Sequence, residues 1–269
     1  MGLNFMKEKK DHGDLKVKEV SCKTALLPSG LEADYALNPY RGCSHGCEYC
    51  YSPFVIREER EWGTFVDVKR NIPKVLAKEL KKKKKGIVRL GSVTDPYQKI
   101  EEDYEITRMC LEQLLKADFP LIVQTKSDLV TRDIDLYSEM DADVGMTITS
   151  LDEDFREKFE PGAPPVEDRI SALEKLVDSG VHTWAFIGPL LPFHNDGPQE
   201  LKNLSERLTD IGVNEVYLDK LNMRKGIWER LEKILDDEMR ERYKKIFFER
   251  KDYFEDHKEL YKKIGRPVF

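Results

Sequence analysis

The stretch of sequence that decides the fold is Asn38-Pro39-Tyr40-Arg41-Gly42-Cys43-Ser44-His45-Gly46-Cys47-Glu48-Tyr49-Cys50-Tyr51. It directly follows the first apolar, β-prone run of the chain, Tyr35–Leu37. A doubly wound dinucleotide-binding fold would carry a G-x-G-x-x-G turn at this point. Here the turn reads Gly42-Cys43-Ser44-His45-Gly46-Cys47, so that fingerprint is absent and the Rossmann fold is disfavoured.

Strand-like runs recur after this stretch and alternate with segments whose apolar residues have helical spacing. The six β-prone runs are Tyr35–Leu37, Ile87–Leu90, Leu121–Gln124, Val144–Ile148, Val181–Ile187 and Val213–Leu218. The helical segments between them are Ile72–Lys82, Tyr104–Lys116, Asp133–Met140, Val166–Ser179 and Gln199–Ile211. Strands that alternate with helices pair in parallel through right-handed crossovers. We therefore expect an α/β fold, a partial (β/α)6 TIM-type barrel of parallel strands.

The two ends of the chain differ from this middle region. Residues 1–30 are polar without a sustained period, which favours an N-terminal arm. Residues 226–269 are rich in Lys, Glu and Arg with apolar residues at helical intervals, which favours a C-terminal helical extension packed on the barrel. The barrel itself is then expected over residues 31–225.

Composition excludes some classes of protein. With 40% hydrophobic and 36% charged residues and a mean hydropathy of -0.58, the chain reads as soluble and globular. A net charge of -6 disfavours a generally basic, non-specific nucleic-acid binder, although 45 Lys and Arg leave room for a local basic groove. The most apolar stretch, Val181–Phe193, is too short to span a bilayer, and the first residues lack the apolar region of a signal peptide. We expect a cytoplasmic protein with no membrane partner.

Three of the five cysteines lie within eight residues, spaced C-x3-C-x2-C. Such clustering indicates a metal site more than disulfides. Thiolates are the usual ligands of iron–sulfur clusters, and three of them on a cubane leave one iron open for a small molecule. The alternative is a structural zinc site that uses His45 or a distant His as its fourth ligand. Structural zinc usually takes ligands from two separated pairs, and no second C-x-x-C occurs in the sequence, so zinc ranks second.

The cysteine spacing, its place after the first strand and the aromatic Tyr49 before the last cysteine resemble the radical S-adenosylmethionine (radical SAM) superfamily. Five blocks between residues 38 and 196 are similar to its spore photoproduct lyase-like group. They are NPYRGCSHGCEYCY, GSVTDPYQ, TKSDLVTRDIDL, TSLDEDFREKFEPGAPP and GPLLPFHND. The resemblance implies a [4Fe–4S] cluster held by Cys43, Cys47 and Cys50. It also implies that S-adenosylmethionine (SAM) binds the fourth iron and is cleaved to methionine and a 5′-deoxyadenosyl radical.

The resemblance further implies SAM-binding roles for residues that follow the second and third strands. Ser92, Thr94 and Asp95 lie where the superfamily handles the methionyl amino group. Lys126 would neutralise the SAM carboxylate. An ordinary strand-to-turn cap before Pro96 and a solvated lysine are the alternatives.

Later segments carry three more residues with such implied roles. Ser150 would touch the methionyl or ribose part of SAM, Glu160 the ribose hydroxyls, and Leu190 would form an apolar wall near adenine. Ser150 also suits a helix N-cap that Glu153 closes as a capping box, and buried leucines are more often plain core.

Tyr49 and Tyr51 flank the last cysteine and could stack on adenine or shield the cluster. Spore photoproduct lyase reverses a thymine dimer in DNA, and in that family a cysteine near the end of the second strand returns a hydrogen atom to the product. Ser92 stands in that region here, and a serine O–H bond is too strong to give up its hydrogen readily. The expected catalytic residue is therefore Tyr51, unless the substrate differs.

The resemblance thus implies a radical SAM enzyme, with a carbon–carbon lyase reaction in DNA repair as one candidate activity. Its expected partners are a nucleic acid or another macromolecular substrate, and an electron donor such as ferredoxin or flavodoxin. The alternative from a different class is a non-enzymatic zinc or iron–sulfur module for electron transfer or scaffolding.

Overall fold

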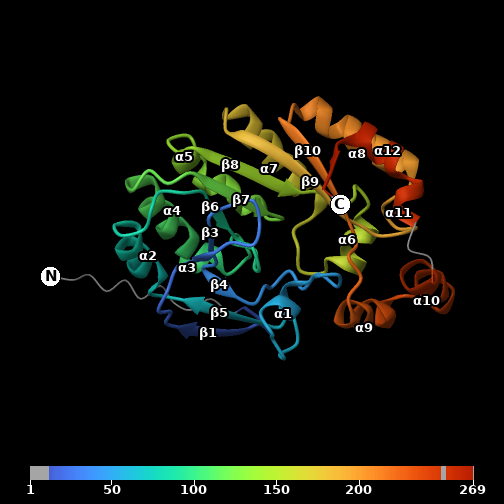
Figure 1. Ribbon diagram of the computed structural model, residues 1–269, viewed down its shortest axis with the longest axis horizontal. Helices are drawn as coiled ribbons and strands as arrows, with labels where there is room; N and C mark the ends of the chain where they lie inside the picture. The colour runs from blue at the N-terminus through green and yellow to red at the C-terminus, as the bar shows by residue number, and fades with distance from the viewer. Residues whose placement is uncertain (1–11, 250–252, 269) are drawn as a thin grey trace.

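The computed structural model describes residues 12–249 and 253–268, and its centre is a curved sheet (Figure 1). Six strands of this sheet are parallel and neighbour one another in chain order. They are β3 (Tyr35–Leu37), β6 (Val88–Leu90), β7 (Leu121–Thr125), β8 (Ala142–Thr147), β9 (His182–Leu190) and β10 (Glu215–Lys220). This arrangement confirms the partial (β/α)6 barrel, and each expected β-prone run contributes one of its strands. At the edges, β2 (Leu26–Pro28) pairs antiparallel with β3, and β11 (Arg266–Pro267) pairs parallel with β10.

Helices follow the outer side of the sheet in Figure 1. They are α2 (Ile72–Leu80), α4 (Ile106–Lys116), α5 (Ile134–Tyr137), α7 (Val166–Asp178) and α8 (Pro198–Ile211). The segment expected as one helix over 104–116 is divided into α3 (Glu101–Tyr104) and α4, because Glu105 is left-handed with φ 51°. The Thr107 amide donates a hydrogen bond to the carboxylate of Glu101 at 2.9 Å. The carboxylate thus satisfies one of the free amide groups at the N-terminus of α4. The segment expected over 133–140 begins earlier, as the 3₁₀ turn η1 (Asp128–Asp133), and α5 is only one turn long.

A second, three-stranded sheet lies below the barrel in Figure 1 and was not predicted. It is formed by β1 (Lys16–Val20), β5 (Phe65–Lys69) and β4 (Tyr40–Arg41), with the short helix α1 (Ser52–Val55) between β4 and β5. Within the segment expected as an arm, residues 16–20 pair with β5 and residues 26–28 pair with β3. The division into arm, barrel and extension stays a prediction.

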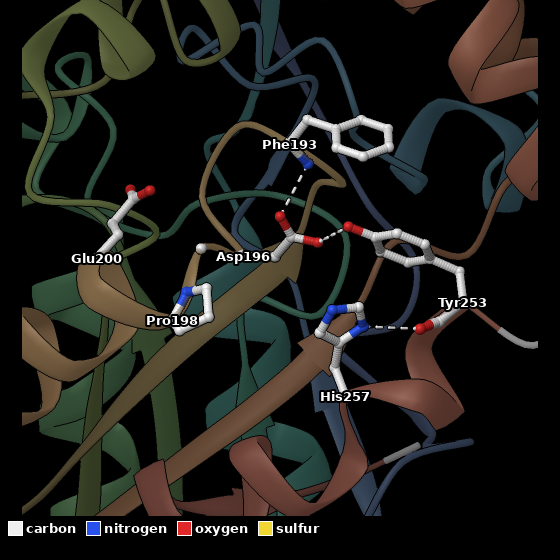
Figure 2. Close-up of a pocket in the computed structure, with 7 residues that line it drawn as sticks. Phe193, Asp196, Pro198, Glu200, Tyr253 and His257 are labelled. Carbon is white, nitrogen blue, oxygen red and sulfur yellow. Dashed lines mark hydrogen bonds between the residues drawn. The ribbon is translucent and has the colours of Figure 1, made fainter.

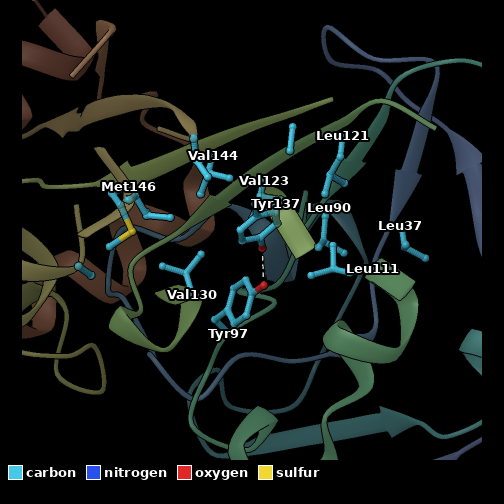
Figure 3. Close-up of a cluster of buried hydrophobic side chains, with 14 of the residues drawn as sticks. Leu37, Leu90, Tyr97, Leu111, Leu121, Val123, Val130, Tyr137, Val144 and Met146 are labelled. Atoms are coloured by element: carbon cyan, nitrogen blue, oxygen red, sulfur yellow. Dashed lines mark hydrogen bonds between the residues drawn. The ribbon is translucent and has the colours of Figure 1, made fainter. Parts of the chain in front are cut away.

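The core fills the space between the sheet and its outer helices (Figure 3). Alternate strand residues such as Leu90, Val123 and Val144 are fully buried on this side and belong to the same hydrophobic cluster as Leu111 of α4. Because side chains alternate along a strand, the residues between them face the interior of the barrel. On each strand, only the side chains that alternate with these core residues can line a site inside the barrel.

The rest of the chain after β10 is mainly helical. It forms α9 (Lys225–Ile234), α10 (Asp237–Lys244), the π-helical turn η2 (Lys245–Glu249), α11 (Tyr253–Asp256) and α12 (Lys258–Ile264), while α6 (Glu153–Phe159) lies within the barrel sequence. Helix α9 meets α1, since a Cβ on Gly226 would come within 1.9 Å of the Phe54 ring. In the described part of the chain, every helix is too short or too polar to cross a membrane.

Candidate active site

The three clustered cysteines lie on the loop between β4 and α1 and line a cavity of about 820 Å³ inside the barrel. Cys43 and Cys47 are buried and Cys50 is half-buried. Burial raises the pKa of Cys43, and it raises the pKa of Cys47 to about 12. Binding of a metal releases the thiol protons, and three thiols on one loop at one cavity are a donor set that suits a metal centre.

The front of this cysteine loop is held by residues that follow β6. The Gly42 carbonyl accepts hydrogen bonds from Thr94 Oγ1 at 2.6 Å and from Gln98 Nε2 at 3.3 Å. The Ser44 amide donates to Gln98 Oε1 at 2.8 Å. Gly42 has φ 90°, and a Cβ there would lie 2.4 Å from the Phe65 carbonyl oxygen, so this turn requires glycine.

The back of the loop rests on the segment that follows α6. The Gly162 amide donates to the His45 carbonyl, and the Glu48 amide donates to the Phe159 carbonyl, each at 2.9 Å. A Cβ on Gly162 would lie 2.1 Å from the Ser44 carbonyl oxygen. The cysteine loop and the segment after α6 are therefore in direct backbone contact, with no room for a side chain at Gly162.

The donor set, three thiols on one loop, fits an iron–sulfur cluster. A zinc ion draws its sulfur ligands to about 2.3 Å from one centre, whereas a cubane spreads three thiolates over three irons. The three thiols on one buried loop are compatible with the second arrangement.

Six of the residues expected at a SAM site line the same cavity as the cysteines. They are Tyr49, Tyr51, Ser92, Thr94, Asp95 and Lys126. The Tyr51 side chain is 44% exposed, and its hydroxyl donates to the Ser92 carbonyl at 2.9 Å. The geometry therefore places Tyr51 against the end of β6, at the rim of the cavity.

Asp95 has four partners already. Its Oδ1 accepts from Thr125 Oγ1 at 2.7 Å and from the Tyr97 amide at 2.9 Å. Its Oδ2 accepts from the Lys126 amide at 2.8 Å and lies 3.4 Å from His45 Nδ1. Asp95 thus joins the ends of β6 and β7 and supports the cysteine loop, and its contact with SAM stays a prediction.

Glu160 lies behind the cavity wall rather than in it. It pairs with Arg169 at 2.5 Å, accepts from Thr149 Oγ1 at 2.6 Å and from the Tyr49 hydroxyl, and lies 3.8 Å from Lys126 Nζ. Burial alone would raise the pKa of Glu160, but Arg169 and Lys126 lower it to about 2. Glu160 therefore stays ionised and orients Tyr49 and Lys126 toward the cavity.

Ser150 and Leu190 do not line the large cavity either. Leu190 is fully buried in the core. The Ser150 hydroxyl donates to Glu200 at 2.6 Å and accepts the Asp152 amide at 3.0 Å, the geometry of a turn. Their roles toward SAM stay predictions.

Glu200 belongs to a second, smaller pocket of about 380 Å³ near the start of α8 (Figure 2). Within it, Asp196 accepts from the Phe193 amide and from the Tyr253 hydroxyl, each at 2.8 Å. The pocket has no cysteine lining, so we place the chemistry in the larger cavity.

The barrel interior contributes cavity residues that sequence reasoning missed. They include Arg89, Gln124, Thr147, Trp184 and Asp219. Arg89 Nη2 donates to Gln124 Oε1 at 2.6 Å, and Gln124 Nε2 donates to Thr147 Oγ1 at 3.2 Å, so one polar row crosses β6, β7 and β8. Polar residues inside otherwise apolar strands, such as Arg89 in Ile87–Leu90, could have pointed to these cavity residues.

Comparisons with known proteins agree with this geometry. A family model described as Radical SAM superfamily matches residues 37–208. An uncharacterized protein of Methanocaldococcus jannaschii is 35% identical over 182 residues, which cover 66% of this chain and 69% of that protein. A radical SAM Nalpha-GlyT isomerase of Pseudomonas phage M6 is 28% identical over 190 residues, covering 67% of this chain and 38% of its own length.

Among solved structures, spore photoproduct lyase with bound AdoMet and dinucleoside spore photoproduct is similar with a TM-score of 0.64 and 18% identity. The similarity covers 88% of this chain and 80% of that one, and at this identity it shows the fold. The family match covers the cysteine loop and strands β6 to β9, and it ends before β10. The chain therefore belongs to the radical SAM superfamily, whose enzymes use a [4Fe–4S] cluster and SAM.

Proposed function

We propose that the large cavity is the active site of a radical SAM enzyme, with Cys43, Cys47 and Cys50 holding three irons of the cluster. The observation that carries this proposal is the convergence of the three thiols and six polar or aromatic expected residues on one cavity. When bound, the cluster and SAM supply a 5′-deoxyadenosyl radical. The residues of the chain bind, orient and shield these groups.

Lys126 is the residue that we assign to the SAM carboxylate. It is in the cavity wall, it lies over the Tyr49 ring at 5.6 Å, and Glu160 raises its pKa against the effect of burial. An ammonium held charged in a buried position favours an anionic ligand. Thr94 and Asp95 lie nearby and fix the loop that presents the cysteines.

We assign hydrogen transfer to Tyr51, because its hydroxyl lies at the cavity rim and is bonded to the carbonyl of Ser92. A carbon–carbon lyase reaction like that of spore photoproduct lyase would need such a donor. The substrate that we propose is a pyrimidine within a nucleic acid, supported by the dinucleoside bound in the structural neighbour. An external donor such as ferredoxin or flavodoxin would supply the electron.

The test is anaerobic reconstitution of the full chain with iron and sulfide, followed by SAM and dithionite. We expect about four irons and four sulfides per chain, and 5′-deoxyadenosine by chromatography. Cys47→Ala should lose both, whereas Cys22→Ser should keep both, because Cys22 lies apart beside Asn71. One zinc per chain, or an intact cluster without SAM cleavage, would instead support the non-enzymatic module.

A further inference from the structure

Arg89 is a guanidinium group inside the barrel that no carboxylate of the described residues approaches within ion-pair distance, although Glu32 lines the same cavity and its charge acts to raise the pKa of Arg89 against the effect of burial. It lies on β6, it is half-buried, and it lines the large cavity three residues before Ser92. Its Nη2 donates to Gln124 Oε1 at 2.6 Å, and within the described chain no carboxylate forms an ion pair with it. The other nitrogens of the group are thus available to the cavity.

The other half-buried or buried arginines of the described chain differ from Arg89 in this respect. Each has a carboxylate within ion-pair distance: these are Arg108, Arg132, Arg156, Arg169, Arg230 and Arg240. Removing an arginine from water is unfavourable unless an anion compensates it. An unpaired Arg89 inside the barrel therefore indicates that its anion comes from a ligand.

Arg89 shares its cavity with Tyr51, the residue that we assign to hydrogen transfer. Arg89 lies on β6, and the Tyr51 hydroxyl donates to the carbonyl of Ser92 just after that strand. Asp219 is on β10, at the other end of the six-strand row, and lines the same cavity. A ligand that reaches from Tyr51 into the barrel would meet the cation on the β6 side.

We propose that Arg89 binds an anionic group of the substrate, a carboxylate or a phosphate, inside the barrel. The planar guanidinium suits either group, because it can donate two parallel hydrogen bonds to adjacent oxygens. Gln124, which lines the same cavity, accepts one hydrogen bond from Nη2 and so restrains the guanidinium. This inference rests on the proposed function, since it places the anion next to the tyrosine assigned to hydrogen transfer.

The experiment measures binding to the reconstituted full chain with SAM present, by anaerobic calorimetry. Two matched pairs of probes differ by one anionic group: orotate against uracil for a carboxylate, and thymidine 5′-monophosphate against thymidine for a phosphate. We expect at least one anionic member to bind about ten-fold or more tightly than its neutral counterpart. The pair with the larger difference identifies the anion. Equal binding within both pairs would overturn the proposal.

Arg89→Gln should abolish the preference for the anionic probe and leave binding of the neutral one unchanged. The matched control is Arg207→Gln, because Arg207 pairs with Glu174 on the outer helices. Arg89→Lys keeps the charge without the planar fork, so it should retain the preference with several-fold weaker binding. A preference that survives in Arg89→Gln, or wild-type affinity in Arg89→Lys, would contradict the assignment.

Cleavage of SAM without added substrate is measured on the same preparations, so that the two proposals fail separately. Formation of 5′-deoxyadenosine without any anion preference overturns the role of Arg89 alone. An Arg89-dependent preference in a protein that does not cleave SAM overturns the proposed reaction alone.

Discussion

Asp219 is an acid that faces the cavity without a cation in ion-pair contact among the described residues, and burial raises its pKa to about 6. An acid whose pKa is higher in the folded than in the unfolded state binds protons on folding. Its ionisation therefore destabilises the fold as the pH rises from about 4 through 6. Because the side chain is half-buried, solvent screening reduces the effect to ~1–2 kcal/mol.

We expect Asp219→Asn to be more stable than the wild type at pH 7.5 by ~1–2 kcal/mol, with the difference vanishing near pH 4. Urea unfolding at several pH values measures it. The control is Asp178→Asn, at an exposed site on α7, which should not show this gain in stability. A pH-independent advantage for Asp219→Asn would rule out ionisation as the cause.

Single residues also show what the sequence could reveal about the site. The common place of the three cysteines at the cavity was predictable because their spacing is local, and their role as cluster ligands stays a prediction. Arg89 and Asp219 were not identified, because their role depends on which face of each strand turns inward. Three of the four partners of Asp95 come from the end of β7 and from the cysteine loop, so most of its contacts are tertiary and no local pattern predicts them.

At the scale of elements, the six-unit barrel was predictable because each strand and helix has its own period in the sequence. The small sheet was not, because β1 reads KVKEV, with mostly exposed residues, and pairs with β5 some 49 positions later in register Lys16↔Phe65. The break between α3 and α4 lies at the left-handed Glu105, and the Glu101 carboxylate accepts a hydrogen bond from the Thr107 amide at the start of the second helix. The helical spacing of apolar residues continues from one helix into the next, so it does not reveal the break between them.

The contact between the loop after α6 and the cysteine loop makes a prediction for Gly162. Gly162→Ala places a methyl group 2.1 Å from the Ser44 carbonyl oxygen, so one loop must move. Such overpacking costs ~1–3 kcal/mol. We expect less than half the wild-type iron per chain after reconstitution, with the helix content unchanged by circular dichroism.

The matched control is Gly197→Ala, where φ is -63° and the nearest atom to a new Cβ is 4.0 Å away. It should keep wild-type iron content. Full iron incorporation in Gly162→Ala would mean that the cysteine loop tolerates displacement and that the close approach does not set its shape.

At the scale of the whole molecule, helix α9 near the C-terminus contacts the cysteine loop near the start of the barrel. Arg230 of α9 donates from Nη2 to the carbonyl oxygens of Cys47 at 2.7 Å and Gly46 at 3.1 Å, and its Nε lies 3.4 Å from Glu48. The partners are 183 residues apart in sequence, so no local pattern predicts the contact. In Figure 1, α9 and α1 lie on the same side of the molecule, below the curved sheet.

This link predicts that the C-terminal helices control how firmly the cluster is held. Arg230→Met removes charge-assisted hydrogen bonds, each worth ~1.5–3 kcal/mol, from two carbonyl groups in the cysteine loop. We expect iron to pass to a chelator about ten-fold faster than in the wild type, followed by absorbance under anaerobic conditions. Lys233→Met, on the exposed face of the same helix, should release iron at the wild-type rate. If the two variants lose iron equally, α9 acts through general stability; if only Arg230→Met is fast, the extension is part of the cluster's binding site.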